Sequence, residues 1–98
     1  MELSFKSIKK GHLVITLEDG RKLTLNSPKL KTIKKWDAKG KNEDLDTTLE
    51  IISEALSSNR EGITITPEDV ESIFDMADLH LFMNKYGEFV EGAVNQKN

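Results

Sequence analysis

The sequence predicts an α+β fold: a three-stranded antiparallel meander followed by three or four helices packed on one sheet face. Apolar and polar residues alternate over residues 1–26, which is the period of a half-buried strand. Apolar residues then recur every three or four positions, as in an amphipathic helix. With 98 residues, the chain has the length of one domain with a thin core. We divide this single domain, 1–98, into the meander (1–26), a basic helix (27–36), a linker (37–44) and an acidic helical part (45–98).

The turns of the meander determine which strand residues face each other. A two-residue loop at Asp19-Gly20 would place the apolar residues of its two strands on opposite faces. A three-residue loop over residues 18–20, with Gly20 in the left-handed region, brings them to one face, and so does a three-residue loop over residues 9–11. The predicted pairs are Ile15 with Leu23, Leu13 with Leu25, Phe5 with Ile15, and Leu3 with Leu17. The shared apolar face needs a cover of helices.

The first helix is predicted to begin at Ser27-Pro28. Ser27 has a side chain that accepts from a free helical N–H, and Pro28 fits the first helical position. Three apolar residues follow at about one-turn spacing: Leu30, Ile33 and Trp36. Residues 37–44 are polar and contain a glycine, which predicts a flexible linker.

The acidic part contains two or three further helices. Residues 45–57 carry an apolar stripe at helical spacing, and Thr66-Pro67 is a strong helix start with Thr66 as the cap. Asp78 either caps a second segment or lies within one long helix. A second stripe covers residues 79–94, with Leu81 on its opposite side. Gly87 costs this helix about 1 kcal/mol unless close packing explains its presence.

Charge divides the chain into two halves. Residues 1–42 have a balance of +7 and residues 43–98 a balance of −10, for a net charge of −3. This division suggests a basic binding arm, or two faces that attract each other between copies. The alternative is that the two halves fold against one another. With no cysteine and apolar runs of at most three residues, no membrane span is expected, and we expect a cytoplasmic protein.

Catalytic and metal-binding patterns are missing from the sequence. Both histidines, His12 and His80, stand apart from any residue at ligand spacing, and the carboxylates of residues 68–78 lack the alternation of a calcium loop. No phosphate-binding, zinc-protease or serine-hydrolase motif occurs. We therefore expect a protein that is not an enzyme and has no catalytic residue, metal or cofactor.

The C-terminal apolar stripe favours binding to another protein. It is rich in aromatic and methionine side chains, which are common on helices that bind hydrophobic partners. The expected contact residues are Phe82, Met83, Tyr86, Phe89 and Val90, followed by Lys31, Lys34 and Lys35 for electrostatic association. Ordinary core packing is the alternative for each apolar member of this set.

Nucleic-acid binding is the rival interpretation. The segment Lys29–Trp36 places four lysines around one aromatic ring, so that the lysines would neutralise phosphates while Trp36 stacks on a base. The acidic half would repel a polyanion, which disfavours nucleic acid as a partner. A subunit of a larger structural assembly with no client is a third possibility.

The order of these parts resembles that of the tail assembly chaperones of long-tailed bacteriophages. The matching segments are LVITLEDGRKLTL, SPKLKTIKKW, LDTTLEIISEAL, TPEDVESI and DLHLFM. The resemblance implies a protein that binds the hydrophobic, helical tape measure protein and helps tail-tube protein polymerise around it. It also implies self-association into a homo-oligomer and action in the cytoplasm of a host cell.

Overall fold

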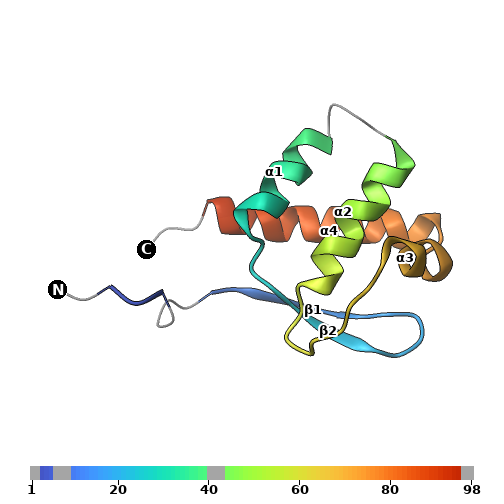
Figure 1. The fold of residues 1–98 in the computed structure, drawn as a ribbon, viewed down its shortest axis with the longest axis horizontal. Helices are drawn as coiled ribbons and strands as arrows, with labels where there is room; N and C mark the ends of the chain where they lie inside the picture. Colours follow the sequence, from blue (N-terminus) through green and yellow to red (C-terminus); the bar gives the residue numbers. More distant parts are fainter. Residues whose placement is uncertain (1–2, 6–9, 40–43, 96–98) are drawn as a thin grey trace.

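The structure, a computed structural model, describes residues 3–5, 10–39 and 44–95. A two-stranded antiparallel sheet, β1 (His12–Thr16) and β2 (Lys22–Asn26), precedes α1 (Leu30–Lys39), α2 (Leu45–Ser57), α3 (Pro67–Ile73) and α4 (Met76–Val94). In Figure 1, α4 passes behind α1 and α2, and the hairpin lies along one side of the helices. The α+β class is confirmed.

The hairpin has the predicted register. Ile15 faces Leu23 and Leu13 faces Leu25, and Gly20 adopts a left-handed φ of 94° in the connecting turn. The N–H of Leu17 donates to the carbonyl of Arg21 at 2.8 Å and closes the three-residue loop. A shift of one residue would have moved the apolar set to the solvent face, which is why the pattern specified the register.

The predicted third strand is not part of this sheet. Leu3 and Phe5 lie outside any strand and are 77% and 71% exposed. A three-residue hairpin loop commonly has its last residue, here Gly11, in the left-handed region, but among the described residues only Gly20 and Gly62 have a positive φ. Residues 6–9, which include the rest of the expected strand and the first residue of its turn, lie outside the described residues.

The basic helix begins later and ends later than predicted. Its first turn is closed by the carbonyl of Lys29, which accepts from the N–H groups of Thr32 and Ile33, both at 3.0 Å. Pairing of β2 continues through Asn26, so residues 27–29 carry the chain from the sheet to the helices. The helix includes the first residues of the predicted linker, and residues 40–43 lie outside the described residues.

Helix α2 has the predicted bounds and forms the centre of the helical layer. Ile52, Ala55 and Leu56 are fully buried, whereas Leu45 at its start is exposed. The connector after α2 is fastened to it by Asn59, whose side chain donates to the carbonyls of Leu56 and Ile63 at 2.7 Å. This connector also covers the outer edge of β2.

Helices α3 and α4 each begin with a capping box. Thr66 accepts from the N–H of Asp69 as predicted, and Asp75 accepts from the N–H of Asp78 at 2.9 Å. Asp78 therefore closes the box of α4 rather than capping it. The two helices are separate because Phe74 has an extended backbone.

The core lies between the sheet and the helices. Its fully buried side chains are Leu23, Leu25, Ile52, Leu56, Ile65, Val70 and Tyr86. The opposite face of the sheet exposes Val14, Thr16 and Lys22, so the helices cover one sheet face as expected. No helix in the described ranges is long and apolar enough to cross a membrane.

Candidate functional site

An apolar groove lies between β1 and the junction of α3 with α4. It has a volume of about 230 Å³ and is open to solvent. Its apolar walls are formed by Leu13, Ile15, Leu17, Ile73, Phe74, Leu81 and Phe82, and its polar rim by Thr16, Glu18, Asp78 and Lys85. We call this set the apolar groove. Its composition, mostly apolar with few charges at the rim, is typical of a binding site.

The break between α3 and α4 lies beside the groove, since residues on both sides of it line the groove. The extended backbone of Phe74 turns the chain, and its ring contacts Phe82 edge-on with centroids 6.1 Å apart. Phe82 is buried and forms the base of the groove, while Leu81, one residue earlier on α4, is 60% exposed at its rim. Leucine 81 points away from the core stripe of α4, as its position in the sequence predicted.

The outer edge of β1 runs along the groove, and within residues 3–5, 10–39 and 44–95 no second strand lies beside it. Because Leu17 bonds to β2 and bonding direction alternates in an antiparallel strand, the N–H and C=O groups of His12, Val14 and Thr16 point away from β2. In the described part of the chain, these outward groups form no strand pairing.

The other edge of the sheet is covered. The N–H of Asn26 donates to the carbonyl of Ser58 at 2.8 Å, and the N–H of Arg60 donates to the carbonyl of Thr24 at 3.0 Å. The carboxylate of Glu61 accepts from both the N–H and the hydroxyl of Thr24, and these bonds lower the pKa of Glu61. The β2 edge of the sheet is therefore occupied by the connector after α2.

The predicted contact residues on α4 lie mainly in the core of this chain. Phe82, Tyr86 and Val90 are buried, and Met83 and Phe89 are half-buried. The Tyr86 ring stacks on Phe82 with centroids 5.2 Å apart. Core packing, the alternative interpretation, therefore applies to Phe82, Tyr86 and Val90, because α4 closes the core against α1 and the sheet. Burial raises the pKa of Tyr86 to about 12.

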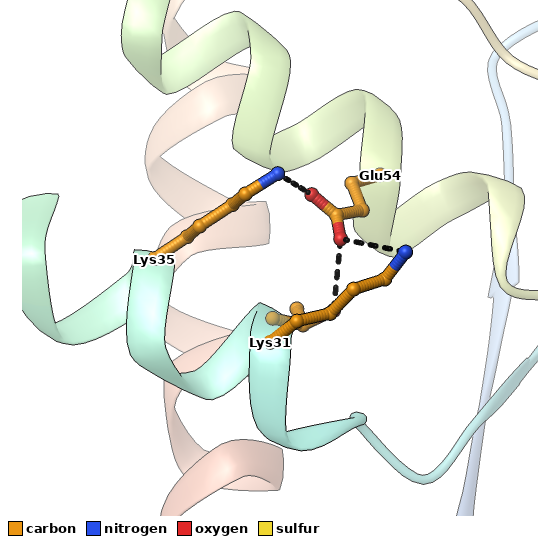
Figure 2. Close-up of polar contacts among 4 residues, drawn as sticks. Lys31, Lys35 and Glu54 are labelled. Carbon is orange, nitrogen blue, oxygen red and sulfur yellow. Dashed lines mark hydrogen bonds and ion pairs between the residues drawn. The ribbon is translucent and has the colours of Figure 1, made fainter.

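The lysines expected to drive association divide into two kinds. Figure 2 shows Glu54 of α2 between Lys31 and Lys35 of α1, at N–O distances of 3.8 and 2.7 Å. The hydrogen bond from Lys35 lowers the pKa of Glu54 and raises that of Lys35. Lys34 is exposed on α1. In this pair of helices, the basic and acidic halves of the chain fold against one another.

Trp36 connects α1 to α4. Its ring lies 5.3 Å from the Tyr86 ring between centroids, and a side chain at Gly87 would come within 3.4 Å of it. This close approach explains the glycine in the middle of α4. Base stacking by Trp36 would require the ring to leave this position, and two of the four neighbouring lysines already pair with Glu54.

Three titratable residues line the groove, namely Glu18, Asp78 and Lys85. Among the described residues, no group of three or more His, Asp or Glu residues is placed to hold a metal ion. The lowered pKa values of Asp69 and Asp19 follow from hydrogen bonds with nearby backbone N–H groups. The arrangement favours contact with apolar side chains.

No family model, curated protein or solved structure matches this chain. Its function is therefore argued from the apolar groove. The sequence interpretation missed the groove because β1, which forms one wall, lies far along the chain from α3 and α4, which form the other. The position of Leu81 outside the apolar stripe of α4 was the one signal that pointed to it.

Proposed function

We propose that the chain is a non-catalytic protein-binding domain that shields an apolar segment of a client during assembly. The observation that carries this proposal is the apolar groove, with the exposed Leu81 at its rim. A helix presenting apolar side chains three or four residues apart matches a groove of this kind. Such a client would lie between β1 and the start of α4.

The client class follows from the resemblance in the order of parts to phage tail assembly chaperones. We propose the tape measure protein as the client and tail-tube protein as a further partner, with action in the host cytoplasm. The groove supports this proposal in one respect, because a long, apolar, helical client needs its exposed side chains covered before assembly. We therefore propose the apolar groove as the contact surface, in place of the face of α4 that the sequence suggested and that is mostly buried.

Co-expression tests this function. The chain would be produced together with the tape measure protein encoded in its own genome, and the soluble fraction of that protein measured. We expect Leu81→Glu to lower the soluble fraction at least tenfold, because a charge at the rim must be desolvated by an apolar client. Leu30→Glu is the matched control, since Leu30 is 84% exposed on α1, away from the groove.

Two results would contradict the proposal. One is a tape measure protein that stays equally soluble with wild type, Leu81→Glu and no chain at all. The other is an equal loss with Leu81→Glu and Leu30→Glu, which would place the contact elsewhere. Circular dichroism and thermal melting of both variants would show that each remains folded.

A further inference from the structure

Two carboxylates lie together at one end of the apolar groove. Glu18 comes from the hairpin turn and Asp78 from the first turn of α4. β1 and α4 run in opposite directions, because Gly11, just before β1, lies against Phe89 in the later half of α4, where a Cβ at Gly11 would be 3.8 Å from the ring. The end of β1 therefore lies toward the start of α4, and Figure 1 shows the hairpin turn and the start of α4 on the same side of the molecule. We call Glu18 and Asp78 the acidic end of the groove.

The acidic end keeps its negative charge within the described part of the chain. No lysine or arginine in the described ranges forms an ion pair with Glu18 or Asp78. Arg21, from the same hairpin turn, pairs with Asp19 at 2.9 Å. The carboxylate of Asp75 accepts from the N–H of Asp78 at 2.9 Å, which holds a third negative charge beside the acidic end.

The wall formed by α3 and the first half of α4 is acidic as a whole. From Glu61 to Asn84 the sequence contains six acidic residues and no lysine or arginine. The rim also contains Lys85, which lies two turns after Asp78, about 10 Å along the helix, and 3.9 Å from Glu88. Charge complementarity at the acidic end therefore favours a partner that is positively charged there.

The size of the groove suits one large apolar side chain. A closed apolar cavity of about 150 Å³ holds a benzene molecule, and the groove has a volume of about 230 Å³. Asp78 lies one turn before Phe82, which forms the base of the groove. On a bound helix, residues three or four positions apart are also separated by one turn on the same face. A helix that inserts an apolar side chain therefore presents its neighbour, one turn away, to the acidic end.

We propose that the client segment is a basic amphipathic helix, with a lysine or arginine one turn from the apolar side chain that enters the groove. The apolar side chain packs on Leu81 and Phe82, and the cation lies between Glu18 and Asp78. This inference rests on the proposed function and adds the charge of the client to it. An acidic helix with the same apolar residues binds more weakly, because like charges repel at the rim.

Binding of defined peptides to the full chain tests this inference. The probes are fluorescein-labelled, alanine-rich peptides of about 20 residues, long enough to form a helix. The lysine peptide has leucines along one face and lysines one turn from them. The glutamate peptide replaces the lysines by glutamates, and the serine peptide keeps the lysines but replaces the leucines by serines. By fluorescence anisotropy, we expect the wild type to bind the lysine peptide about tenfold more tightly than either of the others.

Charge reversal at the rim identifies the site. Glu18→Lys should weaken the lysine peptide about tenfold and strengthen the glutamate peptide, a gain that a misfolded variant could not show. Glu91→Lys is the matched control, since it makes the same change of charge on the exposed last turn of α4, outside the groove. It should change both affinities less than about twofold, because salt screens a distant surface charge. Leu81→Ser, which keeps the net charge, should weaken the lysine peptide without reversing its preference over the glutamate peptide.

Two results overturn the inference, with different consequences for the proposed function. In one, the wild type binds the lysine and glutamate peptides equally and Leu81→Ser weakens both. The groove then binds apolar helices without selecting their charge, and the proposed function stands. In the other, the lysine peptide does not bind, or binds wild type, Leu81→Ser and Glu18→Lys equally. The groove is then not the contact surface, and both proposals fail.

Discussion

Tyr86→Ala is expected to lower the free energy of unfolding by about 4 kcal/mol. Tyr86 is 1% exposed, and its ring lies 5.3, 5.2 and 5.8 Å from the rings of Trp36, Phe82 and Phe89. Removing a large aromatic ring from a packed core costs about 3–5 kcal/mol through lost burial and the remaining cavity. A domain of this size has a total stability of about 5–15 kcal/mol, so the variant would be marginal.

Urea unfolding followed by the fluorescence of Trp36, the single tryptophan, measures this loss. At an m-value of about 2 kcal/mol/M, the midpoint should fall by about 2 M. Leu81→Ala should change stability by less than about 0.5 kcal/mol, because Leu81 is 60% exposed. Equal midpoints for wild type and Tyr86→Ala would refute the docking of α4 and return Tyr86 to the surface.

Three further changes follow from the described contacts. The pKa of Tyr86, the single tyrosine, is raised to about 12, so the tyrosinate absorbance should appear near pH 12 in the folded chain and near pH 10.0 in urea. The free energy of unfolding should therefore fall as the pH rises above 10. Equal titration midpoints of Tyr86 in the folded and unfolded chain would contradict its burial. Glu54→Gln should lower the free energy of unfolding at pH 7, because the lowered pKa of Glu54 stabilises the folded chain while the carboxylate is ionised. The difference in stability between wild type and variant should shrink as the pH falls below the ordinary carboxyl pKa of 4.5. A difference that does not change with pH would exclude the charge of Glu54 as the cause of the destabilisation. Thr66→Ala should cost about 1 kcal/mol in urea unfolding through loss of the cap on α3, whereas the exposed Thr64→Ala should not; equal losses would argue against the cap.

The hairpin and the helix starts were predictable from local rules. A strand with one buried face tolerates a single register, and the loop over residues 18–20 supplied it. Thr66 and Pro67 marked the start of α3 because a cap and an N-terminal proline satisfy free N–H groups locally. In both cases the determining atoms lie within a few residues of each other.

The third strand and the contact surface were not predictable in this way. The alternation of Leu3 and Phe5 favours a strand with one covered face, but it does not say what would provide the cover. The stripe on α4 likewise indicated burial without naming the partner, and the structure places Tyr86 against Trp36 of the same chain. Long-range packing decides whether an apolar helix stripe is buried in its own chain or exposed to a partner, and the spacing of residues in the sequence does not show which.

Amide chemical-shift mapping of the labelled chain, titrated with a soluble apolar fragment of the proposed client, a tape measure protein, tests the role of the groove most directly. The largest shifts are predicted at β1 and around the junction of α3 and α4, from Ile73 to Lys85, with α1 unchanged. Shifts concentrated on the lysines of α1, or none at saturating fragment, would contradict binding in the groove.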